Sequence, residues 1–463
     1  MKEKDFPTSR RKFIRNTAAT AAAGFLIVPR HVLGGKDFIA PSDQVNIGLV
    51  GAGGRGRRNV EELLKLQDVK VTCIADPARY WDLKNFYYKS KAGRGPVKSL
   101  IESSSGKNVR VYQNFLRMLE AEAELDGVLC ATPDHTHAFV CLHAMRAGKH
   151  IYCEKPLTHN IWEAREVRKV AKEMGIVTQM GNQGHSTPAI RSAVEHLRAG
   201  TLGTIHEIHS WVPASRWNRH LTGLPLDTSP VPFDFDWDMW LGPRPYRPFH
   251  HTYAPVSWRD FWEFGCGALG DFGCHDMDAA TWGLHLPLPD TIEVRPAGLT
   301  NDEITPYGEI GYYHFPASEY HPAVSLTWYS GGLRPPKIAA LPKDFSFVNR
   351  GGMYIGEKGI MVTDRSSDLP NFFPKSLGDQ PPKPTLPETN GHHRDWIDAI
   401  KGGAEASSHF DYGAHLTEIT LLGVLSLRLG GAKINWDGEN MKAIGMSEAD
   451  IYIKEPVRTG WEM

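Results

Sequence analysis

The chain has 463 residues, which is long enough for two or three domains and a sizeable buried core. Its 52 lysines and arginines almost balance its 53 aspartates and glutamates, so its charge indicates neither a nucleic-acid partner nor an acidic one. The six cysteines contain no CxxC pair and several lie in apolar runs, which excludes a disulfide-built protein and favours buried thiols.

The first forty residues, 1–40, form a segment of their own. Arg10 and Arg11 precede Phe13 and Ile14, and an alanine-rich apolar stretch follows. This order resembles a twin-arginine signal, and a basic amphipathic helix is the alternative. The apolar stretch is too short to cross a bilayer, and no later segment is long enough. We therefore expect the twin-arginine export machinery as a partner, a periplasmic or otherwise exported protein, and no stable membrane span.

A short apolar run, 45–50, leads into a glycine-rich turn and then into a helical pattern. The turn has the spacing G-x-G-x-x-G, in which the first glycine allows a tight turn, the second lets a pyrophosphate approach the backbone, and the third packs helix on strand. The helix N-terminus then offers N–H groups and a positive dipole to phosphates. This pattern predicts a dinucleotide-binding turn made of Gly51, Ala52, Gly53, Gly54, Arg55 and Gly56.

A second strand pattern ends at Asp76, about twenty residues after Gly56. Rossmann folds place at this point the carboxylate that binds the ribose 2′-hydroxyl of NAD, so Asp76 favours NAD over NADP. Arg55 and the nearby Arg79 keep NADP open as the less favoured cofactor, because either guanidinium can accommodate a 2′-phosphate.

The next strand pattern, 128–131, ends at Thr132, Pro133 and Asp134, and His137 falls in the first turn of the helix that follows. Because the carboxyl ends of parallel strands meet at one edge of a sheet, we expect these four residues to face the same cofactor crevice. A capping or core role is the alternative for His137.

The stretch "YCEKP" ends a further apolar strand, so Lys155 lies at a carboxyl end, where open α/β sheets bind their ligands. The ring of Pro156 fixes its own φ at about −65°, which makes the position of the preceding lysine less dependent on loop flexibility. For an isolated Glu-Lys-Pro, a solvated turn between strand and helix is the alternative.

Four stretches, "GLVGAGGRG", "ATPDHTHAFVCLHAMRAGKHIYCEKP", "GNQGH" and "GALGDFGCHDMD", together resemble the Gfo/Idh/MocA oxidoreductases, the glucose-fructose oxidoreductase and inositol dehydrogenase family. The resemblance implies an α/β fold. An N-terminal Rossmann dinucleotide-binding domain, 41–180, is expected to precede a C-terminal α/β domain, 181–463, with a large, mostly antiparallel open sheet. It also implies NAD as cofactor, a small carbohydrate as substrate, and a homodimer or homotetramer.

The family places the lysine of Glu-Lys-Pro beside the nicotinamide and the substrate hydroxyl, and uses the glutamate to hold the cofactor. These roles fall here on Lys155 and Glu154. An Asp-x-x-x-His pair completes the catalytic group, and it maps onto Asp271 and His275, which share a face if the segment is helical. Asp278 follows one turn later, where it can orient the histidine.

Further cofactor and substrate residues come from three segments. Asn182 and Gln183 resemble the family segment near the nicotinamide ribose. Arg259, together with Trp258, matches a Trp-Arg pair found near cofactor and substrate, although a surface ion pair would explain the arginine equally well. The remaining candidates lie in the aromatic-rich stretch 211–251, a functional or disordered loop, where Trp217 can offer a sugar-binding face and Arg216 can reach hydroxyls; the alternative for these aromatics is packing.

No metal is expected, because the paired histidines at 250–251 and 392–393 lack a zinc-ligand framework. The sequence predicts an exported oxidoreductase that moves hydride between a secondary hydroxyl of a sugar, glycoside or polyol and NAD, with Lys155 or His275 as base. Free NAD is scarce outside the cytoplasm, so we expect tight binding. Two alternatives stay open: an NAD-dependent glycosidase using transient 3-keto oxidation and elimination, and a non-catalytic sugar-binding protein.

Overall fold

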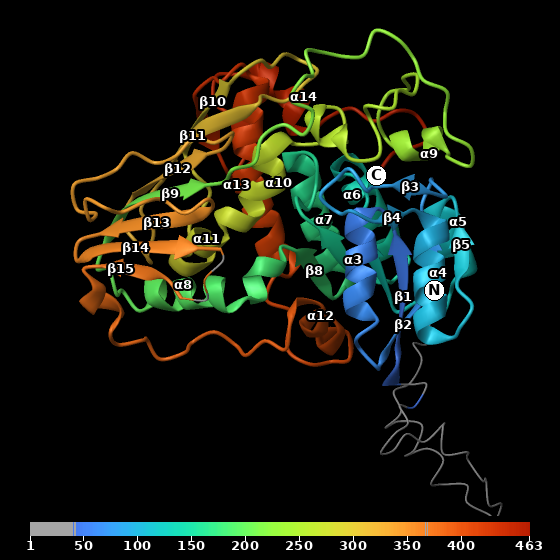
Figure 1. Ribbon diagram of the computed structural model, residues 1–463, viewed down its shortest axis with the longest axis horizontal. Coiled ribbons are helices and arrows are strands. Elements are labelled where there is room, and N and C mark those ends of the chain that lie inside the picture. The colour runs from blue at the N-terminus through green and yellow to red at the C-terminus, as the bar shows by residue number, and fades with distance from the viewer. Residues whose placement is uncertain (1–39, 41–42, 366, 368) are drawn as a thin grey trace, which may run out of the picture. The chain divides into compact units, whose positions relative to one another are not determined.

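The computed structural model describes residue 40 and residues 43–365, 367 and 369–463. The twin-arginine pattern lies outside these residues. The chain divides into two compact units, Met1–Gln44 and Val45–Met463, and the second contains every element discussed below (Figure 1). Among the described helices, none is long and apolar enough to cross a membrane.

The first half of the second unit is built on a parallel sheet. Its strands are β1 (Val45–Val50), β2 (Val69–Ala75), β5 (Arg110–Tyr112), β6 (Gly127–Cys130), β7 (His150–Glu154) and β8 (Thr178–Gly181). They form one six-stranded sheet in the order β5-β2-β1-β6-β7-β8. The chain order reverses at β1, which pairs with both β2 and β6, and such a switch point is where open α/β sheets bind ligands. The expected Rossmann sheet is thereby confirmed.

Helices follow these strands, as a parallel sheet requires. They are α3 (Gly54–Leu63), α4 (Arg94–Ser105), α5 (Phe115–Ala121), α6 (Asp134–Arg146) and α7 (Ile161–Met174). The start of α7 is set by a capping box, in which Asn160 Oδ1 accepts from the N–H of Glu163 at 3.0 Å and the Glu163 carboxylate accepts in return. Between β2 and α4, the short antiparallel strands β3 (Trp81–Asp82) and β4 (Lys91–Ala92) form a flap, residues 81–92.

The second half is built on a larger sheet. Its strands are β9 (Ile205–Trp211), β10 (Thr291–Ala297), β11 (Gly308–Phe315), β12 (Val324–Tyr329), β13 (Gly351–Gly356), β14 (Gly359–Asp364), β15 (Asn371–Phe373), β16 (Ile434–Asp437) and β17 (Lys442–Ala443). They form a nine-stranded sheet in the order β15-β14-β13-β9-β12-β11-β10-β16-β17. Within the described chain, β9 and β12 pair in parallel and the other neighbours are antiparallel, which confirms the expected mostly antiparallel sheet.

The remaining helices are α8 (Pro188–Arg198), α9 (Trp237–Leu241), α10 (Gly267–Asp276), α11 (Asp278–Leu284), α12 (His392–Ile400), α13 (Phe410–Arg428) and α14 (Asp450–Ile453). Short 3₁₀ turns are η2 (Gln183–Ser186), η3 (Ser257–Asp260), η4 (Lys375–Gly378) and η5 (Ser447–Ala449). Helix α13 contacts β8 of the first sheet and β10 of the second, and Figure 1 shows it with α10 between them. Every residue from Leu416 to Leu427 is buried, as expected for a helix surrounded by protein.

The aromatic stretch after β9 is ordered and packs back onto the first half. Phe235 bridges to Ala78, just after β2, and the N–H of Asp236 donates to the carbonyl of Pro77 at 3.1 Å. An aromatic cluster holds this crossing segment, residues 212–265, in place; its large members are Phe235, Trp237, Trp240, Phe249, Tyr253, Trp258, Phe261 and Phe264. Packing, the alternative given above for these aromatics, therefore describes Trp237 and most of the others.

Candidate active site

A cavity of about 400 Å³ opens at the carboxyl ends of the parallel strands. Its wall is formed by the glycine turn, the ends of β2, β6 and β7, the flap, the crossing segment and α10. Most of the residues predicted to bind cofactor or substrate line it: Gly51, Gly53, Gly54, Arg55, Asp76, Thr132, Pro133, Asp134, His137, Glu154, Lys155, Gln183, Trp217, Trp258, Arg259, Asp271 and His275. Four predicted residues lie outside the wall: Ala52, Gly56, Asn182 and Arg216.

The glycine turn has the shape that a pyrophosphate requires. Gly51 has φ of +90°, and a Cβ on Gly56 would collide with the carbonyl oxygen of Gly51, so the third glycine permits close packing of α3 on β1. A Cβ on Gly53 would meet no atom within 4 Å, which leaves open space before the helix. The N-cap residue of α3, Gly53, has no side chain with which to cap the helix, which leaves the first N–H groups available to phosphate oxygens.

Asp76 lies at the end of β2 with both carboxylate oxygens held by the backbone. They accept hydrogen bonds from the N–H groups of Ala52 at 2.6 Å and Ala78 at 2.7 Å. Burial raises the pKa of Asp76 to about 6, against the opposing effect of these bonds. Each oxygen keeps a further lone pair, so Asp76 can still accept from a ribose hydroxyl. Ala52 thus positions Asp76 from outside the cavity.

Glu154 connects the glycine-turn helix to the segment after β8. Its Oε1 accepts from Arg55 Nε at 2.9 Å, Asn59 Nδ2 at 2.7 Å and Gln183 Nε2 at 2.9 Å. Burial raises the pKa of this carboxyl group, but Arg55, Asn59 and Lys155 together outweigh burial and the net pKa is lowered. Glu154 therefore stays ionised, and Arg55 is committed to it, which weakens the case for Arg55 as a 2′-phosphate ligand of NADP.

Lys155 and Asp271 meet inside the cavity from opposite halves of the fold. Lys155 Nζ donates to Asp271 Oδ1 at 2.5 Å and to its backbone carbonyl at 2.7 Å. Arg259 Nε lies 3.4 Å from Asp271 Oδ2, and its guanidinium carbon lies 4.1 Å from the centre of the Trp258 ring. Burial alone would raise the pKa of Asp271, but Lys155 and Arg259 lower it to about 2. Asp271 is thus a permanent carboxylate shared by two cations.

His275 lies one helical turn after Asp271 on α10 and lines the same cavity. Its Nδ1 is buried and has no hydrogen-bond partner in the described part of the chain. Burial, followed by the nearby charge of Lys155, lowers the pKa of His275 well below its usual value of 6.5. The imidazole is therefore neutral at neutral pH, which is the form that accepts a proton.

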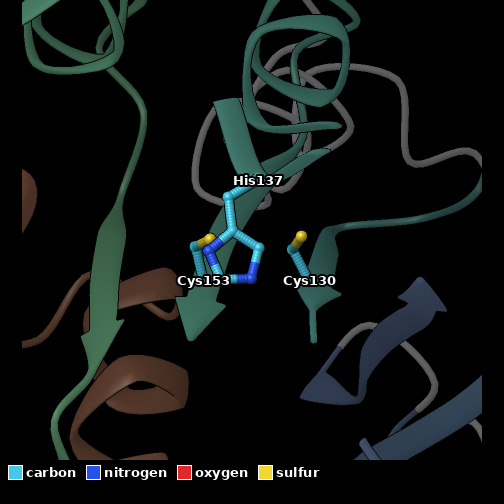
Figure 2. Close-up of side chains that lie close together, drawn as sticks. All are labelled: Cys130, His137 and Cys153. Atoms are coloured by element: carbon cyan, nitrogen blue, oxygen red, sulfur yellow. The ribbon is translucent and has the colours of Figure 1, made fainter. Parts of the chain in front are cut away.

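Cys130, His137 and Cys153 form one group whose potential metal-ligand atoms all lie within 4.8 Å of one another (Figure 2). All three side chains are buried, and His137 also lines the cavity. Both ring nitrogens of His137 contact backbone carbonyls, Nδ1 that of Pro156 at 2.8 Å and Nε2 that of Thr132 at 2.9 Å. His137 thus connects the loop after β6 to the loop that carries Lys155, and we assign it to positioning these loops instead of to a metal.

Comparison with known proteins decides the family. A sequence model described as an oxidoreductase family with an NAD-binding Rossmann fold matches residues 45–182, and its companion for the C-terminal alpha/beta domain matches residues 198–315. Together they cover more than half of the chain. The chain belongs to the Gfo/Idh/MocA oxidoreductase family.

Individual relatives of this Gfo/Idh/MocA protein are distant. Rhizopine catabolism protein MocA of Rhizobium meliloti is 26% identical over 236 residues, 51% of this chain and 56% of that protein. The NAD(+)-dependent scyllo-inositol 2-dehydrogenase of Bacillus subtilis is 25% identical over 246 residues, 49% of this chain and 66% of that protein. These two matches span between about half and two thirds of the relatives' own length. The WlbA dehydrogenase of Bordetella pertussis, solved with NADH and UDP-GlcNAcA, has a TM-score of 0.57 at 15% identity, covering 85% of this chain and 99% of that one, and shares the fold.

Asp278 does not orient the histidine of this Gfo/Idh/MocA protein, contrary to the expectation from its spacing. Its carboxylate is 3.0 Å from His185 Nδ1, and it accepts from Asn182 Nδ2 at 3.2 Å and Tyr412 Oη at 2.5 Å. Asn182 is consequently buried in this network behind the cavity wall. We therefore reassign Asn182 from cofactor contact to support of the η2 turn.

Arg216 also departs from its expected role in substrate binding. Its Nη1 donates to the carbonyls of Leu299 and Thr305, each at 3.1 Å, and its Nε donates to that of Asn218 at 3.2 Å. Through these bonds the buried guanidinium holds loop backbone in place, and Arg216 does not line the cavity. The neighbouring Trp217 does line the cavity, with 38% of its surface exposed.

Several residues that line the cavity of this Gfo/Idh/MocA protein were not predicted from the sequence, among them Arg350, Tyr88 and Trp461. Arg350, just before β13, makes a bidentate contact with Asp276 at 2.8 and 2.6 Å. Tyr88, from the flap, packs on Gly54 so closely that a Cβ there would collide with its ring. Trp461 reaches the wall from beyond α14. No local motif marks these positions, because distant segments bring them to the site.

Proposed function

We propose that this protein is an exported oxidoreductase that transfers hydride between a secondary hydroxyl of a sugar, glycoside or polyol and tightly held NAD. The observation that carries the proposal is that Lys155, Asp271 and His275 share one cavity with the glycine turn of an NAD-binding fold. The scyllo-inositol 2-dehydrogenase relative supports a polyhydroxylated substrate. Export rests on the Arg10–Arg11 pattern.

NAD, when bound, supplies the hydride-accepting ring, and the chain supplies position and proton transfer. The neutral imidazole of His275 accepts the proton of the reacting hydroxyl. Lys155 Nζ, already held by two oxygens of Asp271, has a remaining N–H with which to bind the substrate oxygen. Asp271 stays ionised and fixes the lysine. This division of roles makes His275 the base and Lys155 the orienting donor.

The first test uses the protein as purified, with no nucleotide added. Denaturation should release stoichiometric NAD, and one class among a panel of glycosides, free sugars and polyols should produce reduced nicotinamide absorbance in the intact protein. A protein that neither contains nor binds NAD would contradict the proposal and favour the sugar-binding alternative.

The pH dependence of turnover tests the assignment of the base. Because burial lowers the pKa of His275 well below 6.5, the proton-accepting form already predominates at that pH. We expect log kcat/KM to be flat through pH 6.5 and to fall only at more acidic pH. His275→Gln should lower kcat/KM by about 100-fold or more. An inflection in the wild-type profile at the usual histidine pKa would contradict this assignment.

A redox-neutral glycosidase cycle is the second candidate, because the crossing segment and the flap both contribute wall residues to the cavity, which can help to retain the cofactor. A retained cofactor can return its hydride to the same substrate. Product analysis separates the two: net oxidation yields a keto sugar and reduced nicotinamide, whereas the cycle releases an aglycone with no lasting change in nicotinamide absorbance.

A further inference from the structure

The cavity has two chemically different ends. Lys155 follows β7, whereas Asp76 follows β2 and Gln113 follows β5, so the strand order places them on opposite sides of β1. In a Rossmann fold the carboxylate after the second strand faces the adenosine ribose. The β2–β5 side is therefore the adenosine end of the proposed dinucleotide site, and the β7 side is the nicotinamide end.

Trp461 forms part of the wall at the adenosine end. Its ring lies 4.8 Å from that of Phe139, which in turn lies 5.7 Å from Phe115 at the start of α5, next to β5. All three line the cavity, together with Met239 and Trp240 of α9. This wall combines flat aromatic faces with few polar groups, which suits a purine base.

Arg458 fastens the segment that carries Trp461 to α9. Its Nη1 donates to Asp238 Oδ1 at 2.5 Å, its Nη2 to the Asp238 carbonyl at 2.7 Å, and its Nε to the Gly242 carbonyl at 2.6 Å. Its guanidinium carbon also lies 5.1 Å from the centre of the Trp461 ring. One arginine thus fixes both the backbone of α9 and the tryptophan.

Helix α9 is itself tied to the first half of the fold. His135 Nε2 lies 2.9 Å from the carbonyl of Trp240, and Arg94 pairs with Asp234 at 2.5 Å. The crossing segment is therefore bonded to the first half of the fold and contributes Met239 and Trp240 to the cavity wall, to which Trp461 also belongs.

We propose that Arg458 and Trp461 form a latch that retains the dinucleotide by closing the adenosine end of the cavity. The inference rests on the proposed function and deepens it, because it assigns tight retention to two residues far from the Rossmann motif. The latch acts on the rate at which the dinucleotide leaves, and it has no part in proton transfer.

The test measures dinucleotide release directly. Wild type, Trp461→Ala and Arg458→Ala are saturated with NADH, and its dissociation rate is followed by the loss of energy transfer from tryptophan after adding excess NAD. Removing an aromatic face beside a base costs about 1–3 kcal/mol in related stacking sites, so Trp461→Ala should release NADH between about 5-fold and about 150-fold faster. Arg458→Ala should change the rate in the same direction.

Trp162→Ala is the matched control. Trp162 packs near the same segment, with Lys454 Nζ 4.0 Å from its ring centre, but it does not line the cavity. It should release NADH at the wild-type rate, and all variants should bind at saturating NADH if they fold. Equal rates for Trp461→Ala and wild type would overturn the latch and leave the proposed function intact. A wild-type protein that binds no dinucleotide would overturn both.

Discussion

Lys155→Ala is expected to lower kcat/KM by about 1,000-fold or more while the protein keeps its dinucleotide. The substitution removes the proposed donor to the reacting hydroxyl and leaves Asp271 with Arg259 as its remaining cation. Glu154 and the glycine turn, which we propose to hold the cofactor, are untouched. Steady-state kinetics on the identified substrate, together with the dinucleotide content of the purified variant, measure both effects.

Lys149→Ala is the control for this prediction. Lys149 Nζ donates to the carbonyls of Ala123 and Leu125, at 2.7 and 2.9 Å, at the opposite end of the same strand. Its loss should leave kcat/KM within about 2-fold of wild type, since no group in the cavity changes. A Lys155→Ala variant with more than a tenth of wild-type activity would rule out the proposed role. A wild type that binds sugar without turnover would instead support the binding-protein alternative.

Asp271→Asn is expected to destabilise the fold by about 3 kcal/mol as well as impair turnover. Only 14% of the Asp271 side chain is exposed, so the substitution leaves Lys155 and Arg259 close together without a counter-charge. Denaturant unfolding at neutral pH measures the loss. Asp411→Asn is the control, because the ion pair of Asp411 with Arg168 is half exposed and worth at most about 1 kcal/mol.

The lowered pKa of Asp271 predicts how the free energy of unfolding depends on pH. Folding lowers the pKa of Asp271 from 3.8 to about 2, so its contribution of about 2 kcal/mol is present above pH 4 and is lost as the pH falls towards 2. The stability difference between wild type and Asp271→Asn should narrow over that interval. A difference that is constant from pH 5 to pH 2, or a variant as stable as Asp411→Asn, would contradict the buried ion-pair assignment.

The Rossmann half could be predicted because its information is local. The glycine spacing, the strand before it and the position of Asp76 each depend on a few consecutive residues, and all of them agree. The placement of Lys155 at the end of a strand follows from the same kind of pattern. Asp271 and His275 could be paired because α10 continues without a break between them.

Asp278 shows why such reasoning fails a few residues later. Its distance of three residues from His275 suggests one more helical turn, but α10 ends at Asp276 and α11 begins at Asp278. The break redirects the carboxylate to Asn182, His185 and Tyr412. The roles of Arg216 and Trp461 could not be predicted for a related reason. Their contacts depend on tertiary packing with distant segments, which the neighbouring sequence does not indicate.

The burial of α13 between β8 and β10 affects how the protein unfolds. One apolar core runs through this helix and includes residues of both sheets, such as Val128 and Ile292. The two sheets are therefore separate in their strand pairing, but their side chains pack into one common hydrophobic core. Because this core includes residues of both sheets, we expect the two sheets to unfold together in one cooperative transition.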